Sequence, residues 1–424
     1  MSTHTRRALL GALTLALVAS AVNVPTATAL ARPPEPAATE PLRLVLPRPT
    51  GPYPIGSTEL HLVDQHRADP WRPERRRELM VSLWYPARPG GGQPVTPYLP
   101  AGAAQRFGVR GDAQLGLAPG RVDWPGINTH ARTGAPVRTR PGGHPVVLFS
   151  PGGGVPRALG TVLVEELASR GYVVVTVDHT YETPEVEFPG GRIEVQHLPE
   201  GDPTGLNHAL IRTRVGDTRF VLDQLAELAA GRNPDAESRR LPDGLVRALD
   251  LSRVGMFGHS AGGFTTAETM LVDRRVDAGI NMDGSMAYSF STGDLGEVTV
   301  RGLDRPFLLM GAGVSGGVPH THRDAVDWAA FWAHSTGWQR DLYIPHGEHF
   351  TFTDYPALIP QLERAFDLPP GLVTDSIGTV DPTRITSSLR AYVTAFFEQH
   401  LRHRPQPLLD RPSPAHPDIT HIPA

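Results

Sequence analysis

The chain has 424 residues, of which 40% are hydrophobic and 20% are charged, a composition typical of a globular protein with a full core. The formal net charge of −4 gives no electrostatic reason to expect a nucleic-acid partner. Because the chain has no cysteine, disulfide bonds, thiolate metal sites and thiol-based catalysis are excluded.

The first residues have the pattern of an export signal. Arg6 and Arg7 precede a mostly apolar run over residues 8–22, and small residues follow up to Ala29 or Ala31. The run is short for a bilayer span, which favours a cleaved signal over a membrane anchor. We therefore expect residues 1–31 to be a signal peptide of a secreted protein, and the paired arginines are compatible with twin-arginine export.

The rest of the chain divides by composition into three parts. Residues 32–50 are rich in proline and alanine, and are expected to form a disordered leader. Residues 51–403 are predicted to form one catalytic domain. Residues 404–424 have many prolines and little apolar pattern, so a tail that lies on the surface or frays is expected there.

Apolar runs and helix-compatible segments alternate along the predicted domain. Strands are expected at residues 60–63, 78–85, 145–149, 172–177, 254–256, 276–282, 307–310 and 341–344. Helices are expected near residues 159–169, 207–230, 264–272, 325–334 and 382–401. Residues 89–143 are turn-rich and are interpreted as a long insertion. The alternation predicts an α/β fold of the α/β-hydrolase kind, with a mainly parallel sheet covered by helices on both faces.

The run Gly258-His259-Ser260-Ala261-Gly262 is the most informative motif in the chain. It lies between a predicted strand and a predicted helix, which is the context of a nucleophilic serine on a strand-to-helix turn. Glycines two residues before and after the serine permit a turn in which larger side chains would collide with neighbouring elements. Ser260 is therefore predicted to be a nucleophile, and His259 to pack under the turn.

A serine nucleophile needs a histidine to take its proton and a carboxylate to orient that histidine. In this fold the acid follows the serine along the chain. Asp283 comes directly after the predicted strand 276–282 and is the first choice, although an Asp-Gly pair also favours a plain turn. Asp324 and Asp327 are the alternatives, but helix capping at the start of the next helix is a sufficient explanation for them.

Two candidate histidines, His346 and His349, follow the last predicted strand. His349 is preferred because it lies deeper in the loop, beside Phe350 and Phe352, which can exclude water. His346 is interpreted as a supporting or structural residue. The predicted substrate contacts are Phe350, Phe352 and Met286.

The tetrahedral intermediate also needs backbone donors, and the loss of one donor typically costs about 10²- to 10³-fold in rate. The N–H of Ala261, next to the nucleophile, is one predicted donor. The glycine-rich loop over residues 150–154 is expected to supply the other, with Gly153 preferred. A plain flexible turn is the alternative for this loop, and a phosphate cradle is disfavoured because no Lys-Ser or Lys-Thr pair follows. This chemistry requires no metal or organic cofactor.

With these motifs, the chain resembles the secreted platelet-activating factor acetylhydrolase family, a serine-dependent branch of the α/β-hydrolases. The resemblance runs from residue 51 to residue 401 and is carried by residues 79–86, 152–154, 167–179, 258–260, 282–284 and 349–354. It implies Ser260 as nucleophile, Asp283 as acid and His349 as base. Pro151 and Ala261 depart from the residues usual in the family, and the small Ala261 implies a wider acyl pocket.

The sequence thus predicts a secreted serine ester hydrolase that cleaves short-chain or phospholipid-like acyl esters through an acyl-enzyme. A lipase or polyesterase of the cutinase type is the alternative within the enzyme class. A catalytically inactive binding protein is the alternative outside it. The expected partners are a small-molecule or lipid ester and, transiently, a lipid interface, and the protein is expected to be a monomer.

Overall fold

The computed structural model describes residues 40–315 and 317–424. The predicted signal peptide and the first part of the predicted leader lie outside this range. Among the helices of the described residues, none is long and apolar enough to cross a membrane.

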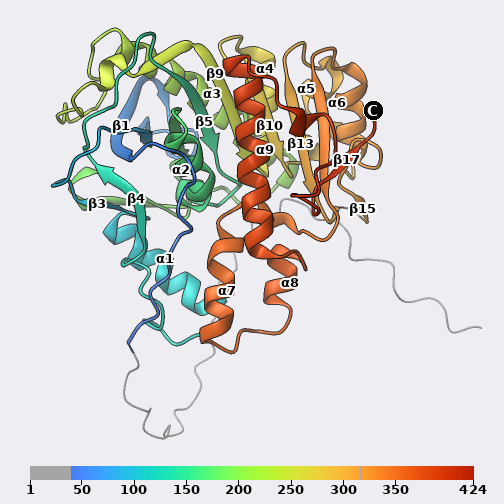
Figure 1. Cartoon of the computed structure of the whole chain (residues 1–424), viewed down its shortest axis with the longest axis horizontal. Helices are drawn as coiled ribbons and strands as arrows, with labels where there is room; N and C mark the ends of the chain where they lie inside the picture. The colour runs from blue at the N-terminus through green and yellow to red at the C-terminus, as the bar shows by residue number, and fades with distance from the viewer. Residues whose placement is uncertain (1–39, 316) are drawn as a thin grey trace, which may run out of the picture.

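An eleven-stranded sheet runs through the centre of the molecule, in the order β17-β16-β13-β10-β9-β5-β6-β2-β1-β4-β3 (Figure 1). Six neighbouring strands are parallel: β16 (Gln339–Ile344), β13 (Phe307–Ala312), β10 (Ala278–Met282), β9 (Leu249–His259), β5 (His144–Ser150) and β6 (Val173–Asp178). The strands outside them are β17 (Thr420–Ile422), β2 (Arg76–Pro86), β1 (Ile55–Ala68), β4 (Asn128–Thr133) and β3 (Val95–Pro97). The predicted α/β fold with a mainly parallel sheet is confirmed.

Helices cover both faces of this sheet, and each face has its own hydrophobic cluster. One cluster contains residues of α3 (Pro203–Ala229), α4 (Ala261–Val272) and α6 (Val326–His334), and the other contains residues of α2 (Thr161–Ser169) and α9 (Pro382–Arg402). Along β5, Val146 and Leu148 belong to the first cluster, whereas Val147 and Phe149 belong to the second. Because both faces are buried, the strand is an uninterrupted apolar run in the sequence.

The remaining elements are short and lie in the connections between strands. Three two-stranded sheets are formed by β7 (Glu185–Glu187) with β8 (Ile193–Val195), β11 (Ala287–Ser289) with β12 (Asp294–Leu295), and β14 (Val314–Ser315) with β15 (Val318–Pro319). The short helices are α5 (Glu297–Arg301), η1 (Arg157–Gly160), η2 (Pro189–Gly191), η3 (Leu245–Arg247), η4 (His349–Phe352) and η5 (Pro407–Leu409).

Three further helices, α1 (Ala101–Gln114), α7 (Tyr355–Ala365) and α8 (Leu372–Ile377), lie beyond the lower end of the sheet (Figure 1). α1 falls in the turn-rich segment 89–143, interpreted as a long insertion, in which no helix was predicted. Its Gly108 and Gly111 lie against Trp124, where an added Cβ would be 2.7 Å and 3.0 Å from the ring. Close packing on Trp124 therefore outweighs the low helix propensity of the two glycines.

The second part of the predicted leader is ordered, which corrects the expectation of disorder up to residue 50. Leu44 and Leu46 are 1% and 2% exposed and join a cluster with Leu358 and Leu362 of α7. The N–H of Leu42 donates to the carbonyl oxygen of Arg121 at 2.8 Å. The leucines alternate with more exposed residues, which is the pattern of an extended segment with one buried face.

The predicted tail also contributes to the domain. β17 pairs antiparallel with β16 at the edge of the sheet, and Leu409 and Ile419 are buried. The Arg384 guanidinium of α9 pairs with Asp418 at 2.6 Å. The tail is therefore a part of the fold that lies along its edge, and fraying was the wrong expectation for it.

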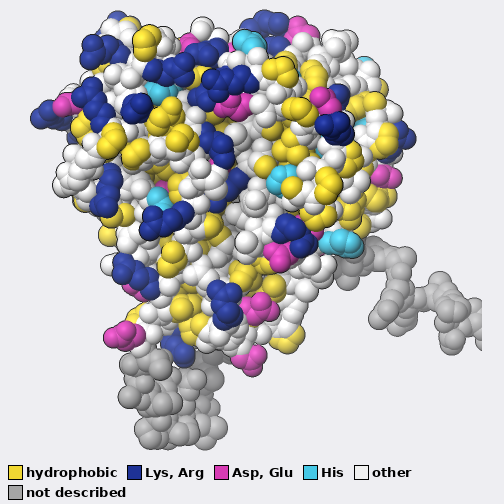
Figure 2. All heavy atoms as spheres, viewed as in Figure 1, with side chains coloured by type: hydrophobic (Ala, Val, Ile, Leu, Met, Phe, Trp, Pro, Cys, Tyr) yellow, Lys and Arg dark blue, Asp and Glu magenta, His cyan; other side chains and the backbone are white. Residues whose placement is uncertain are grey.

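Folding also gathers arginines that are far apart in the sequence. Figure 2 shows Arg side chains grouped in the upper part of the view, around the end of α9. A cavity of about 830 Å³ in this region is lined by Arg88, Arg138, Arg140, Arg170, Arg402 and Arg404. The basic residues are therefore less scattered over the surface than the sequence indicates.

The ordered segment before β1 gives a stability prediction. Leu46→Ala should lower the free energy of unfolding by about 2–5 kcal/mol, because it removes a buried side chain and leaves a cavity. The neighbouring Val45 is 63% exposed, so Val45→Ala should change it by less than about 0.5 kcal/mol. Urea unfolding of the two variants measures this, and equal effects would show that the segment is not part of the core.

Candidate active site

Ser260 lies at the turn between β9 and α4, with φ 56° and ψ −124°. This conformation is uncommon for a residue other than glycine and is typical of a strained functional turn. An added Cβ on Gly258 would lie 2.2 Å from the backbone of Gly262, and one on Gly262 would lie 1.9 Å from the carbonyl oxygen of Ser150. Both positions therefore require glycine, as the sequence predicts.

The backbone ties this turn to the neighbouring strand ends. The Ser260 N–H donates to the carbonyl oxygen of Met282 at 2.9 Å, and the Asp283 N–H donates to that of Met310 at 2.8 Å. Asp283 also has a positive φ of 57°, which aspartate tolerates better than most residues. The nucleophile candidate and the acid candidate are thus fixed on adjacent parallel strands.

The Asp283 carboxylate is buried and receives three donors. One oxygen accepts from His349 Nδ1 at 2.6 Å, and the other accepts from His320 Nδ1 at 2.8 Å and from the Ala312 N–H at 3.0 Å. Burial alone would raise the pKa of Asp283, but the two histidines hold this pKa well below its usual range. Asp283 is therefore an ionised carboxylate that can orient a histidine.

His349 begins η4 in the loop after β16. The Glu348 side chain and Thr351 cap this turn reciprocally, and the Glu348 N–H donates to Thr351 Oγ1 at 2.8 Å. Because Asp283 accepts from Nδ1, the Nε2 of His349 is left to take a proton. His346 is exposed, so the structure places His349, rather than His346, on the Asp283 carboxylate.

His259 links the serine turn to the histidine loop. Its Nε2 donates to the carbonyl oxygen of His349 at 2.9 Å, and the two rings lie 4.5 Å apart. Burial, with the neighbouring His349, lowers the pKa of His259 to about 3, so this imidazole is neutral. His259 therefore packs under the turn, as expected, and also supports the loop that carries His349.

The segments of Ser260 and His349 are thus joined by the contact of His259 with the His349 backbone. The hydrogen bonds within the described residues do not include one from the Ser260 hydroxyl. In enzymes of this kind, the hydrogen bond between nucleophile and base commonly tightens only when the substrate binds.

The sequence did not predict His320. Its side chain is 3% exposed and packs on Trp328, with the ring centroids 4.0 Å apart. Burial lowers the pKa of His320, but Asp283 raises it more, so the pKa lies above the usual value. No motif surrounds His320, and its contact depends on how the loop after β13 folds back.

The alternative acids have other partners. Asp324 accepts from the Thr321 hydroxyl at 2.6 Å. Asp327 is buried and accepts from the Met286 N–H at 2.6 Å and from the Ser285 hydroxyl at 3.2 Å. Asp327 therefore holds the segment that follows Asp283, and helix capping does not describe its role.

The glycine loop lies directly against the serine turn. An added Cβ on Gly152 would be 3.4 Å from the Ser260 Cβ and 3.0 Å from His259 Nδ1. Gly153 follows in this loop, and its N–H does not donate to any other residue in the described range. Ala261 is the first residue of α4, where the N–H has no intrahelical acceptor. Both predicted oxyanion donors are therefore N–H groups without an acceptor in the described residues.

Comparison with known proteins shows the family of this chain. The sequence profile of the family described as platelet-activating factor acetylhydrolase, isoform II, matches residues 42–294, which include Ser260 and Asp283. The chain belongs to this family.

A relative in Arthroderma benhamiae, named a probable 1-alkyl-2-acetylglycerophosphocholine esterase, is 29% identical over 91% of this chain and 96% of its own length. The platelet-activating factor acetylhydrolase of Cavia porcellus is 26% identical over 56% of this chain and 55% of its own length. A solved structure of a ferulic acid esterase from Streptomyces cinnamoneus is 40% identical, with a TM-score of 0.72, and covers 90% of this chain and 99% of its own. The protein is thus a carboxylic ester hydrolase with the α/β-hydrolase fold, as the sequence predicts.

The three residues predicted to contact substrate in this family member differ in placement. Phe350 lies against His349, with the rings 5.5 Å apart, and stacks on Tyr355 at 5.1 Å. Phe350 also lines an apolar cavity of about 280 Å³ together with Phe107, Trp124, Tyr355, Leu358 and Leu372. Phe352 and Met286 are 1% and 0% exposed and belong to the two hydrophobic clusters. Their burial argues against the predicted contact with substrate.

Clusters of three or more His, Asp or Glu side chains that could hold a metal ion do not occur within residues 40–315 and 317–424. The titratable groups of the site are instead paired with one another through Asp283.

The pair of His320 and Asp283 gives a pH-dependent prediction. Because the pKa of His320 is raised in the folded protein, its stabilising charge is fully present below pH 6.5 and is lost as the pH rises through the raised value. His320→Asn keeps a donor but removes the charge. It should cost about 1.5–3 kcal/mol of unfolding free energy near pH 6, the usual worth of a hydrogen bond between charged groups, and less near pH 9.

Urea unfolding at the two pH values measures this difference. The exposed His346 is the matched control, and His346→Asn should change the unfolding free energy by less than about 0.5 kcal/mol at either pH. An equal cost of His320→Asn at both pH values would show that the charge on His320 has no role.

Proposed function

We propose that the protein is a serine carboxylesterase in which Ser260, Asp283 and His349 form the catalytic triad. The observation that carries the proposal is the 2.6 Å contact between the Asp283 carboxylate and His349 Nδ1, next to a strained turn that presents Ser260. The chain order of serine, acid and histidine is that of the α/β-hydrolases.

The mechanism follows from the roles that these positions permit. His349 Nε2 accepts the Ser260 hydroxyl proton while Oγ attacks the ester carbonyl carbon, and Asp283 stabilises the imidazolium that forms. The N–H groups of Ala261 and Gly153 donate to the oxyanion of the tetrahedral intermediate. His349 then returns the proton to the leaving alcohol, and the acyl-enzyme remains. Water, deprotonated by His349, attacks the acyl carbon and releases the acid together with the free Ser260 hydroxyl.

For the substrate, we infer short-chain or phospholipid-like acyl esters. The family profile and the names of the fungal and mammalian relatives support this class. Export by residues 1–31, a monomeric state and contact with a lipid interface stay predictions.

Aromatic acyl esters, such as feruloyl esters, are the second candidate. Two observations favour them: the 40% identity to the ferulic acid esterase structure, and the aromatic lining of the cavity to which Phe350, the neighbour of His349, contributes. Phe107, Trp124 and Phe350 contribute aromatic faces to this cavity, and such faces can pack against the ring of an aromatic acid.

A substrate panel tests both the chemistry and the substrate class. It comprises p-nitrophenyl acetate, butyrate and palmitate, a 1-alkyl-2-acetylglycerophosphocholine, and methyl ferulate, compared by kcat/KM. The acetyl esters and the phospholipid should be preferred. A clear preference for methyl ferulate would establish the second candidate, and a steep preference for palmitate would contradict both and point to a lipase.

Variants in the same assay test the triad. Ser260→Ala and His349→Ala should each lower kcat by about 10⁴- to 10⁶-fold, because nucleophile and base act as a unit. Ser252 is an exposed serine on the same strand, and Ser252→Ala should retain full activity. Activity that survives Ser260→Ala would refute the proposed mechanism whichever substrate is used.

A further inference from the structure

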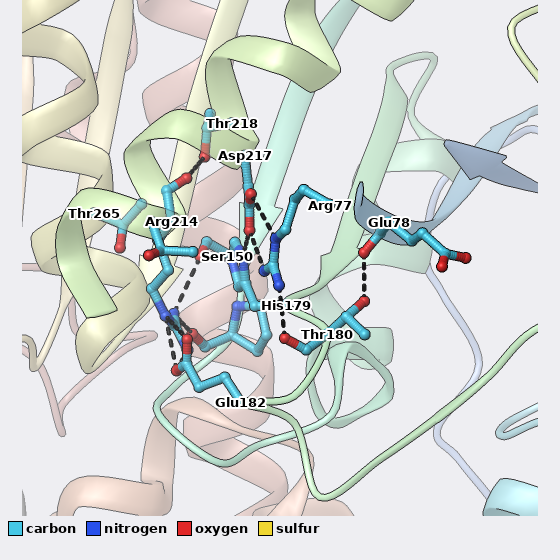
Figure 3. A network of polar contacts seen from close by, with 12 residues as sticks. Arg77, Glu78, Ser150, His179, Thr180, Glu182, Arg214, Asp217, Thr218 and Thr265 are labelled. Atoms are coloured by element: carbon cyan, nitrogen blue, oxygen red, sulfur yellow. Dashed lines mark hydrogen bonds and ion pairs between the residues drawn. The ribbon is translucent and has the colours of Figure 1, made fainter. Parts of the chain in front are cut away.

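A buried arginine lies against the glycine loop on the side of α3 (Figure 3). Arg214 of α3 is 1% exposed, and its guanidinium donates to two successive carbonyl oxygens of the loop. Nη1 donates to Pro151 at 2.6 Å, and Nη2 donates to Gly152 at 3.0 Å. A cation in the core is therefore used to hold the backbone of the loop.

The contact of Arg214 with the Gly152 carbonyl also sets the direction of the Gly153 N–H, the predicted oxyanion donor. In a planar trans peptide, the N–H points away from the C=O of the same unit. The carbonyl of Gly152 shares its peptide unit with the N–H of Gly153. Because Arg214 holds that carbonyl, the Gly153 N–H must point to the opposite side of the loop. The same holds for the Pro151 carbonyl and the Gly152 N–H.

Glu182 offsets the cost of burying the Arg214 charge by forming an ion pair with it. Both of its carboxylate oxygens accept from Arg214 Nε at 2.9 Å, and one of them also accepts from Nη2. Glu182 is itself 1% exposed, so the two charges are removed from water together. The carboxylate neutralises the guanidinium and still leaves its donors directed at the two loop carbonyls.

A second buried chain of contacts fixes the start of the loop (Figure 3). Ser150 Oγ lies 3.2 Å from His179 Nε2, and His179 Nδ1 lies 2.9 Å from the Asp217 carboxylate. Burial and the nearby Arg214 lower the pKa of His179, whereas Arg77 outweighs burial and holds the pKa of Asp217 well below its usual range. Neutral His179 therefore donates from Nδ1 to Asp217, and its Nε2 accepts a hydrogen bond from the Ser150 hydroxyl.

We propose that Arg214, paired with Glu182, is a positioning residue that orients the glycine loop, residues 150–154, so that the Gly153 N–H can bind the oxyanion. The proposal rests on the proposed function. Arg214 acts through the backbone of the loop, because its guanidinium contacts the loop carbonyls on the side opposite to the Gly153 N–H. Removing Arg214 should therefore weaken the binding of the transition state and leave the binding of the intact ester unchanged.

The experiment uses the full-length mature enzyme with Arg214→Met and with the double variant Arg214→Met/Glu182→Met. Replacing a buried ion pair by apolar side chains is often neutral for stability, so the double variant is the one expected to fold with a wild-type Tm. For p-nitrophenyl acetate, kcat should fall by about 10²-fold, within the range for loss of one oxyanion donor, while KM changes by less than about threefold. Arg214→Lys, with a single point donor, should give an intermediate kcat.

Inhibition by a methyl trifluoromethyl ketone supplies the second readout, because serine adds to it and forms a bound oxyanion. Its inhibition constant should rise by about the same factor as kcat falls, as expected for a transition-state contact. A purely structural defect would lower the fraction of active enzyme without changing this constant.

Arg402 is the matched control. It pairs with Glu398 and donates to the carbonyl oxygens of Arg170 and Gly171 at 3.1 Å and 2.6 Å, at the end of α9 away from the site. Arg402→Met should leave kcat and the inhibition constant unchanged. If the Arg214 variants fold and keep wild-type kcat while Ser260→Ala is inactive, the positioning role of Arg214 is refuted and the proposed function stands. If Ser260→Ala stays active, the proposed function itself fails.

Discussion

The carboxylate of Asp283 is the interaction on which the site depends. It is buried at the end of β10 and is shared by His349, His320 and the Ala312 N–H, so each of its oxygens has a defined partner. An ionised carboxylate in the core is stable only when it is paired in this way. The pairing keeps Asp283 charged, and the charge in turn fixes the orientation of His349 next to the Ser260 turn.

Around this carboxylate, backbone hydrogen bonds between strand ends set the positions of the serine and the acid, and one buried arginine side chain holds the glycine loop. Ser260 is held by the carbonyl of Met282, and Asp283 by that of Met310, so adjacent parallel strands fix the distance between them. The Arg214 guanidinium donates hydrogen bonds to two carbonyl oxygens of the glycine loop after β5. Rigid strands and a buried ion pair thereby present three chain segments at one edge of the sheet, as is usual in open α/β sheets.

The local sequence was sufficient to pick out candidate site residues where the residues next to them in the chain also show the pattern. The Ser260 turn could be recognised because it needs glycine on both sides. Asp283 was the preferred acid because it directly follows a predicted strand, and His349 was the preferred base because it lies deeper in the loop after the last predicted strand. His320 and Arg214 could not be predicted, since their contacts arise from a returning loop and from a helix that is distant along the chain. The ordered Leu44 and Leu46 and helix α1 were missed for a related reason: prolines and glycines hide them, and tertiary packing decides their conformation.

The positions of Phe350 and Phe352 show that residues near His349 in the sequence need not line the same cavity. Both closely follow His349 in the sequence, yet Phe350 lines the aromatic cavity and Phe352 is buried in the core. The two residues therefore differ through the orientation of η4, which spacing alone does not give.

The most direct test of the proposed triad is the site of covalent labelling by a fluorophosphonate, measured by intact mass and peptide mapping in wild type and in His349→Ala. We predict one adduct per chain, on Ser260, formed at least about 10³-fold more slowly when His349 is removed. An adduct on another residue, or a labelling rate that does not depend on His349, would contradict it.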